Sequence, residues 1–521
     1  MATRKNVRLT VILIFLSALV CILSTCRSPL QQNSAASKDL PASRSVSSSD
    51  ASLVLTSPDG KGRLAVLDEA TGKYLLHLEG SAYAMGYQHG YLLAKEVRNT
   101  CSLDFFRSIV LDFLGSDPTL AAVINNDALF STLLNTVNAA AVTQAVYATY
   151  DMRQEMKGIA DGAKKRLAEL GESPGSVCYE RIILTNLAFD VILSYVYPII
   201  VRDYLSADEK ASLDTKALVE SMHMCDGFVA ASSATATGGS LMARSFMISD
   251  CIGTRSLLME YAPASGNAFM AVNIPGFVGT PAAMNRCGVS IGMDMVPALQ
   301  TNPVAPGMGC LLTARYVMQN CASVSSALSA IKSSVTRGVS WIYLVGDPVT
   351  GAVAEAAATT GLGWMPSQAK YFAARGLDYF FDPSAYPAAG IDQLETRPDL
   401  VVTSNHFIDP TVRQASGSYA VKESTARYDY LTGRVLSAVD SGLGVAAAER
   451  LVNYLSPLAD NPYANDLMAN PFGSGTARVG DYYAGKEYVH GIRAVFEPTT
   501  LRAHVLYGHW TDPWIDYGMR N

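Results

Sequence analysis

The chain has 521 residues, of which 49% are hydrophobic, and this is enough to bury one large core or two ordinary ones. Its 40 basic and 46 acidic side chains give a net charge of −6, which argues against a nucleic-acid partner. No C-x-x-C, H-E-x-x-H or G-x-x-x-x-G-K-[ST] motif occurs and the seven histidines are scattered. Zinc, dithiol and P-loop chemistry therefore have no support, and we expect neither a cofactor nor a metal.

The first 26 residues read as an export signal. Basic residues precede an apolar run at 9–23, which is long for a signal core and short for a membrane span. "LSTC" at 23–26 resembles a bacterial lipobox, with Thr25 where Gly, Ala or Ser is usual. We predict lipidation of Cys26 and a lipoprotein of the cell envelope, anchored in the membrane on its periplasmic or extracellular face. The alternative is an uncleaved N-terminal anchor.

Residues 27–53 are rich in Ser and Ala and lack apolar clusters, so they are predicted to form a flexible tether. The cysteine count also bears on function. Of the nine cysteines, removal of Cys21 with the signal and lipidation of Cys26 leave seven. Because seven is odd, at least one thiol stays free unless chains cross-link.

Residues 54–224 are predicted to be a mainly helical region, which would be a pro-segment or an α-chain. Short apolar runs between turn signals at 54–78 predict a small strand pair, and residues 82–205 read as helices. Gly86 and Gly90 lie four residues apart, a spacing that permits close helix packing. His89 on the same helix is interpreted as a hydrogen-bonded structural histidine. A second amphipathic helix is expected to end at Gly171.

Residues 225–521 are predicted to form a strand-rich core. Short apolar or alternating runs separated by Gly, Pro and Asn follow Cys225, and residues 310–334 read as helical. Two hairpins are expected, one around Asp347-Pro348 and one around Glu497-Pro498. The fold class is therefore α+β, with layered sheets and helices.

Cys225 stands where a helix-like sequence pattern changes to a strand-like one, and it has two interpretations. A buried strand cysteine simply packs as a small hydrophobic residue. A nucleophilic cysteine needs a base or local positive charge, because its ordinary pKa is near 8.5. His223 is one candidate base. The α-amino group that Cys225 would gain if the Met224–Cys225 bond were cut is another, and Arg244 is predicted to lie across a hairpin from Cys225.

Ser290 is a rival nucleophile, because "GVSIG" at 288–292 matches G-x-S-x-G. The elbow of α/β-hydrolases requires a strand before the serine and a helix directly after it. The residues that follow, "MDMVPALQTNP", are poor helix formers. We therefore interpret this match as chance.

Six motifs are spread through most of the chain: "AYAMGYQHGYLLAKE" (82–96), "MKGIADGA" (156–163), "CDGFVAASSATATGGSLMARSFM" (225–247), "AMNRCGVSIGMD" (283–294), "TSNHF" (403–407) and "STARYDYL" (424–431). Together and in this order they resemble the C45-type Ntn hydrolases, the acyltransferase and acylase group typified by isopenicillin N acyltransferase, with a fold like that of choloylglycine hydrolase.

The resemblance implies an αββα sandwich preceded by an N-terminal helical region, with the nucleophile, Cys225, as the first residue of the mature core. It implies an oxyanion hole at Asn405 with Asn285 assisting, and it assigns Arg244 and Arg427 to the family's arginines. Many relatives carry an aspartate shortly after the motif arginine. This chain has Met247 there, and Asp250 is the candidate replacement.

The resemblance also implies an exported amidohydrolase or acyltransferase acting on a C–N amide, with an N-acyl amino compound or a β-lactam-like molecule as substrate. Hydrolysis is favoured over transfer because the cell envelope offers water but little acyl-CoA. A lipid or carboxylic-ester hydrolase of the phospholipase-B-like type, and a non-catalytic binding lipoprotein, are the alternatives. The expected partners are the small acyl substrate and, through the lipid anchor, the membrane.

Overall fold

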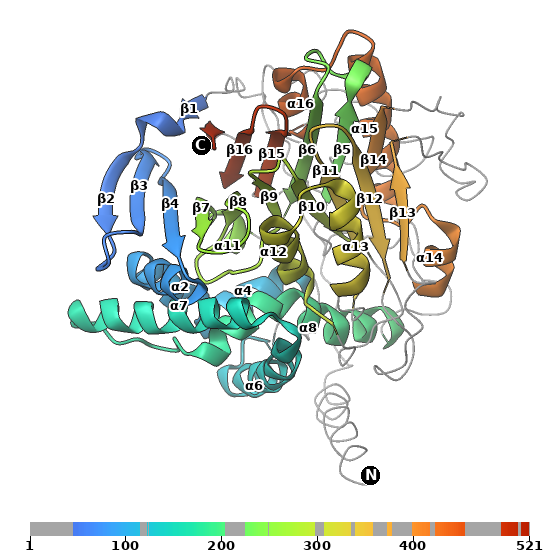
Figure 1. The fold of residues 1–521 in the computed structure, drawn as a ribbon. Helices are drawn as coiled ribbons and strands as arrows, with labels where there is room; N and C mark the ends of the chain where they lie inside the picture. The colour runs from blue at the N-terminus through green and yellow to red at the C-terminus, as the bar shows by residue number, and fades with distance from the viewer. Residues whose placement is uncertain are drawn as a thin grey trace, which may run out of the picture.

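The computed structural model describes residues 45–114, 122, 124–203, 225–247, 250–296, 307–334, 339–357, 372–377, 399–416, 422–453, 491–508 and 512–519. Within these residues two β-sheets are accompanied by helices, which confirms the α+β prediction (Figure 1). No helix in the described part of the chain is both long and apolar enough to span a bilayer. The Cys26 lipidation site and the export signal lie outside the described residues.

One sheet has seven strands in the order β1-β17-β16-β15-β6-β5-β14. Its neighbouring strands are antiparallel except for the parallel edge pair β1–β17. The predicted hairpin around Glu497-Pro498 is present as β15 and β16. The strand bounds are β1 Ser45–Ser47, β5 Cys225–Ala231, β6 Ser240–Met247, β14 Leu400–Thr403, β15 Gly491–Glu497, β16 Arg502–Gly508 and β17 Trp514–Gly518.

The second sheet has ten strands in the order β13-β12-β11-β10-β9-β8-β7-β4-β3-β2. The predicted hairpin around Asp347-Pro348 is present as β11 and β12. The strand bounds are β2 Ser52–Thr56, β3 Arg63–Asp68, β4 Lys73–Gly80, β7 Leu257–Pro263, β8 Phe269–Asn273, β9 Ala282–Asn285, β10 Ser290–Met295, β11 Trp341–Gly346, β12 Gly351–Ala356 and β13 Phe372–Gly376.

Two sequence predictions about the N-terminal part need correction. Residues 45–53 were expected in the tether, but β1 pairs with β17 and β2 pairs with β3. This polar segment has too few apolar side chains to fold alone. It becomes ordered because its backbone forms hydrogen bonds with a neighbouring strand. The predicted strand pair at 54–78 is part of a three-stranded unit, and β4 joins β7 in parallel. The sheet therefore crosses the predicted boundary at Cys225.

The two sheets face each other through β5 and β6 on one side and β10, β11 and β12 on the other. Helices α15 (Lys422–Val439) and α16 (Val445–Val452) pack against the seven-stranded sheet. Helices α12 (Cys310–Asn320) and α13 (Val324–Ser334) pack against the ten-stranded sheet. The predicted helical stretch at 310–334 is thus two helices. The short helices α11 and α14 span Asp250–Gly253 and Pro410–Ser416.

The N-terminal helices lie together beside the ten-stranded sheet (Figure 1). The close helix packing expected at Gly86 and Gly90 is present, because a Cβ added at either position would lie 2.0 Å from a backbone oxygen of α7. His89 accepts a hydrogen bond from Gly276 N, which confirms its structural role. The helix bounds are α2 Ala82–Leu92, α3 Ala94–Thr100, α4 Leu103–Leu114, α6 Asp127–Gln144, α7 Tyr150–Glu169 and α8 Tyr179–Asp203.

A buried ion pair ties these helices to the sheet. Arg315 of α12 donates to both oxygens of Glu155 of α7, at 3.2 and 2.8 Å, and both side chains are buried. The Arg315 guanidinium also lies 4.5 Å from the ring centroids of Tyr261 and Phe269. Because a buried carboxylate needs such partners, this pair fixes α7 against the core.

Candidate active site

Cys225 is the first residue of β5, and every residue of that strand is buried. Its thiol belongs to the core between the two sheets, whereas Phe228 and Ala230 belong to the cluster that packs with α15 and α16. This is the alternation expected of a strand that is buried on both faces. Cys225 is 1% exposed and forms no disulfide.

Arg244 lies near Cys225 but is offset from the predicted position. In the β5–β6 pairing, Cys225 is opposite Phe246, and Arg244 is opposite Gly227. Arg244 and Phe246 are two residues apart, so Arg244 shares the face of the sheet on which the thiol lies. Gly292 of β10 leaves room for the arginine, because a Cβ there would lie 2.6 Å from Arg244 Cδ.

The Arg244 guanidinium joins the two sheets. It donates to Pro281 O at 2.5 Å and to Met293 O at 2.7 Å. It also forms a buried ion pair with Asp294, with 3.5 Å between Nη2 and Oδ1. These acceptors, together with Ser245 O at 3.4 Å, hold the guanidinium rigidly, which suits an arginine that supplies fixed positive charge near a thiol.

Asp294 also belongs to the buried residues around Cys225 and Arg244, although the sequence did not predict it as a site residue. It is 2% exposed, and Thr403 Oγ1 donates to its Oδ2 at 3.1 Å. Burial raises the pKa of its carboxyl to about 7, although Arg244 acts in the opposite direction. The sequence does carry a signal for Asp294, because it is a single acid in the apolar strand "SIGMDM". Acids are rarely buried without a partner, so such an acid indicates a buried charge pair.

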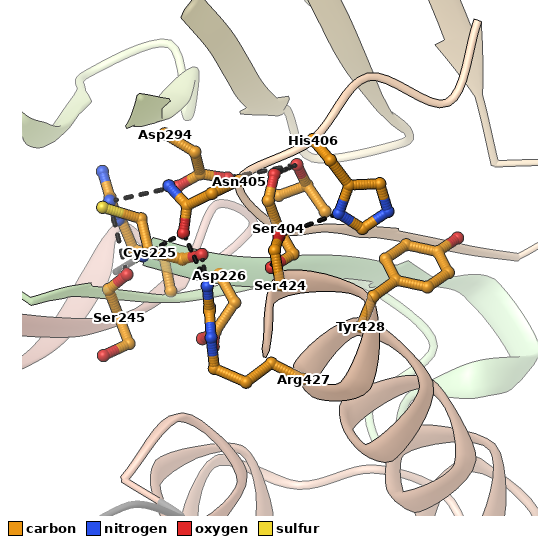
Figure 2. Close-up of polar contacts among 12 residues, drawn as sticks. Cys225, Asp226, Ser245, Asp294, Ser404, Asn405, His406, Ser424, Arg427 and Tyr428 are labelled. Atoms are coloured by element: carbon orange, nitrogen blue, oxygen red, sulfur yellow. Dashed lines mark hydrogen bonds and ion pairs between the residues drawn. The ribbon is translucent and has the colours of Figure 1, made fainter. Parts of the chain in front are cut away.

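Asn405 and Arg427 converge on the backbone of Cys225 (Figure 2). Cys225 N donates to Asn405 Oδ1 at 2.7 Å, and Arg427 Nη1 donates to Cys225 O at 2.9 Å. Arg427 Nη2 also donates to Asn405 Oδ1, at 2.8 Å. Asn405 follows β14 and Arg427 lies on α15, so the fold brings together three segments that are far apart in the sequence.

Asp226 completes the charged group on the other face of β5. Its Oδ2 accepts from Arg427 Nη1 at 3.1 Å, and both side chains are fully buried. Arg427 therefore lies in the interior, bonded to the strand that begins with Cys225, and is not a surface residue of α15. Asn405 Nδ2 donates to Met295 O at 2.7 Å, which links the same residue to β10 of the other sheet.

The thiol is held in its neutral form by this environment. Burial, followed by the nearby Asp294 carboxyl, raises the pKa of the Cys225 thiol to about 12, against the opposing effect of Arg244 and Arg427. His406 is also held neutral, since burial lowers its pKa to about 3. Its Nδ1 is 2.8 Å from Ser424 Oγ. The candidate base His223 and the bond partner Met224 lie outside the described residues.

Asn285 makes none of its described hydrogen bonds with the Cys225 group. Its Nδ2 donates to Met318 O at 2.9 Å and to Cys321 O at 2.8 Å. Its Oδ1 accepts from Cys287 N and Val289 N. These bonds occupy both amide hydrogens and fix the β9–β10 turn to the end of α12.

Ser290 lies in a strand, as expected for a chance motif match. It is the first residue of β10, paired with Met284 and Gly346, and β10 continues to Met295. Its hydroxyl donates to Gly346 O at 3.3 Å. A nucleophile elbow needs a helix directly after the serine, and this one is followed by strand.

Other kinds of site receive less support. In the described ranges, no group of three or more His, Cys, Asp or Glu side chains is placed to hold a metal ion. A cavity of about 650 Å³ opens beside β2, β3 and β17, with Leu53, Ala65 and Tyr517 in its walls, and contains none of the residues around Cys225. The Asp250 side chain, suggested as a replacement acid, is outside the described part.

A search for a matching protein family found none. The chain is 37% identical over 461 residues to a protein of Archaeoglobus fulgidus whose name is "Uncharacterized protein", and the match covers 88% of this chain and 67% of that one. The chain therefore belongs to the same family as this archaeal protein.

Three solved structures are similar over about half of the chain. A Caenorhabditis elegans ortholog of N-acylethanolamine-hydrolyzing acid amidase is 11% identical, covers 53% of this chain and 93% of its own, and has a TM-score of 0.31. A mutant conjugated bile acid hydrolase from Clostridium perfringens is 9% identical, with coverages of 57% and 97% and a TM-score of 0.32. Penicillin V acylase from Agrobacterium tumefaciens is 14% identical, with coverages of 56% and 86% and a TM-score of 0.27.

Proposed function

We propose that the protein is an N-terminal-nucleophile amide hydrolase with the Cys225 thiol as its nucleophile. The observation that carries the proposal is the set of hydrogen bonds around the Cys225 backbone. Asn405 accepts from the nitrogen of this residue and Arg427 donates to its carbonyl oxygen. Side chains from two other segments thus hold both backbone polar groups of Cys225, and they would fix the nitrogen beside the thiol if that nitrogen became a free amino group acting as a base.

Maturation would cut the Met224–Cys225 bond. The thiol adds to the Met224 carbonyl carbon, and collapse breaks the C–N bond and leaves a thioester on Sγ and a free α-amino group. Water then hydrolyses the thioester, gives Met224 a carboxyl group and restores the thiol. A cut there would leave the described strand β5, Cys225–Ala231, whole.

Turnover would follow the same chemistry. The α-amino group, with an ordinary pKa near 8, takes the thiol proton as sulfur attacks the acyl carbonyl, and then gives it to the departing amine. Water, deprotonated by the same group, releases the acid from the thioester. Arg244 and Arg427 supply positive charge that acts to lower the pKa of the buried thiol, against the larger effect of burial.

Asn405 would also stabilise the oxyanion. One Nδ2 hydrogen is committed to Met295 O, and the other has no acceptor among the described residues. An amide N–H aimed at the developing negative charge is what acyl transfer needs. Asp294, paired with Arg244, would take the place of the acid that relatives carry after the motif arginine.

The remaining parts of the proposal rest on the sequence. The facing sheets and their helices would be the αββα sandwich of Ntn hydrolases. The protein would be exported, lipidated at Cys26 and anchored at the cell envelope, where water favours hydrolysis over acyl transfer. The expected substrate is an N-acyl amino compound or a β-lactam-like amide.

The test is acyl release from a panel of N-acyl amino acids and β-lactams, with carboxylic esters and phospholipids beside them. We expect amide hydrolysis by the wild type and none by Cys225→Ala, which removes only one sulfur atom and should leave the fold nearly intact. Faster ester or phospholipid cleavage would replace the amidase with a lipid hydrolase. Equal activity in the variant and the wild type would exclude the thiol mechanism.

A further inference from the structure

A second buried ion pair lies beside the segment that carries Asn405. Glu355 of β12 accepts from Arg375 Nε of β13 at 3.2 Å, and the two side chains are 1% and 4% exposed. Both strands belong to the ten-stranded sheet, whereas Asn405 follows β14 of the seven-stranded sheet. The pair therefore acts between the two sheets.

The two members of this pair hold opposite ends of one short segment. Arg375 Nη2 donates to Val402 O at 2.7 Å, three residues before Asn405. Glu355 Oε1 accepts from Ile408 N at 3.0 Å, three residues after it, and Glu355 Oε2 accepts from Asp409 N at 2.9 Å. The segment is thus fixed at both ends by one ion pair, with Asn405 at its centre.

The burial of this pair makes it sensitive to loss of charge. Desolvation raises the pKa of the Glu355 carboxyl, and Arg375 together with the two backbone N–H groups acts against that rise. Removing the negative charge would take from the buried Arg375 the carboxylate that Glu355 supplies, and breaking a buried ion pair is strongly unfavourable. It would also leave one of the two backbone donors, Ile408 N or Asp409 N, facing a donor instead of an acceptor.

We propose that the Glu355–Arg375 pair is a positioning element that sets the place of Asn405 against Cys225. Among the described residues no hydrogen bond or ion pair joins either side chain to Cys225, Asn405 or Arg427, so the pair acts through the segment 402–409. This inference rests on the proposed function. Its physical basis is that Asn405 Oδ1 meets Cys225 N at 2.7 Å, a distance that a shift of the segment would lengthen.

The first experiment uses Glu355→Gln, which keeps the shape but turns one carboxylate oxygen into a donor. We expect kcat to fall about 10- to 100-fold with little change in KM, because a misplacement of about 1 Å has effects of this size. Arg375→Lys keeps the charge and loses the forked geometry, and should show a smaller loss of the same kind. It serves as the second variant if Glu355→Gln does not fold.

The matched control is Glu155→Gln. Glu155 is equally buried and paired with Arg315, but its ion pair holds α7 and makes no described contact with the Asn405 segment. Each variant is combined with Asn405→Ala. Because a positioning residue acts through Asn405, the Glu355→Gln effect on kcat should largely vanish in that background, whereas any Glu155→Gln effect should add. Full additivity for Glu355→Gln would overturn the proposal.

The second experiment does not depend on activity. In the Cys225→Ala background the chain stays uncut, so position 225 keeps a backbone N–H. Hydrogen exchange read by mass spectrometry should accelerate about 10-fold or more at 225, 408 and 409 together in Glu355→Gln, and at none of them in Glu155→Gln. Faster exchange at 408 and 409 with unchanged exchange at 225 would overturn the inference. A wild type without Cys225-dependent hydrolysis would instead reject the proposed function and leave the exchange result to decide the positioning role.

Discussion

Cys225 N and Asn405 Oδ1 are 2.7 Å apart, and the oxygen receives a second hydrogen bond from Arg427 Nη2 at 2.8 Å. Two donors on one amide oxygen fix which atom of the Asn405 amide faces Cys225, since the nitrogen end has no lone pair to offer. An α-amino group released at Cys225 would keep this acceptor, and its nitrogen lone pair would remain available for the thiol proton.

Asn405→Ala should lower kcat about 10²–10³-fold, the usual effect of losing one oxyanion-hole donor. The variant also loses the acceptor for Cys225 N. Asn405→Asp separates the two roles, because it keeps an acceptor for Cys225 N but has no N–H for Met295 O or for an oxyanion. Acyl-release kinetics of both variants give the kcat lost with each role. Near wild-type kcat in Asn405→Ala would remove Asn405 from the mechanism.

Gly292→Ala should displace Arg244, because the new Cβ would lie 2.6 Å from Arg244 Cδ. Overpacking of this kind lowers the free energy of unfolding by about 1–3 kcal/mol, and the displaced guanidinium should also slow turnover. The control is Gly433→Ala on α15, where a Cβ would have no neighbour within 4 Å. The measurements are the urea midpoint of unfolding and the kcat of Gly292→Ala, each compared with the value for Gly433→Ala. Equal behaviour of the two variants would mean that Arg244 adapts without loss.

The sequence located the residues whose signal is local. The change of pattern at Cys225 makes it a candidate, and the resemblance of short motifs to a known family assigns its role and those of Asn405 and Arg427. The structure brings all three together. The hairpins at Asp347-Pro348 and Glu497-Pro498 were also predictable, because turn residues between apolar runs specify hairpins.

The features that the sequence missed depend on long-range contacts. Asp294 joins the site only because β10 of one sheet faces β6 of the other. Residues 45–47 become a strand only because β17, at the far end of the chain, offers its edge. The offset of Arg244 from Cys225 is set by the β5–β6 register, and composition does not specify a register to one residue.

Ser290→Ala should retain most of the activity. The Ser290 hydroxyl makes one described hydrogen bond, to Gly346 O, and its loss should cost about 1 kcal/mol of unfolding free energy. Acyl release from the same amide panel, normalised to folded protein, gives the comparison. Activity lost in Ser290→Ala and kept in Cys225→Ala would point to a serine hydrolase.

Asp294 should make stability fall as pH rises from about 4 to 7. Burial raises the pKa of its carboxyl from the ordinary 3.8 to about 7, with Arg244, Asp226, Thr403 and Arg427 as its other influences. Between these values the folded protein binds a proton that the unfolded chain has released, so the stabilisation present below pH 4 is lost through pH 7. Asp294→Asn lacks this titration.

The measurement is urea unfolding of the wild type and of Asp294→Asn at several pH values across this window. The difference between them isolates Asp294 from the other titrating groups. We expect the wild type to lose stability relative to the variant as pH rises. A pH-independent difference would show that the carboxyl keeps an ordinary pKa.

The N-terminus of the active enzyme tests the central claim most directly. Protein produced from the full chain is purified by its amide-hydrolysing activity, and the new N-termini are read by mass spectrometry beside Cys225→Ala. We expect the active wild type to contain a chain that begins at Cys225, and Cys225→Ala to remain uncut and inactive. Full activity in a wild-type chain that is uncut between Met224 and Cys225 would contradict it.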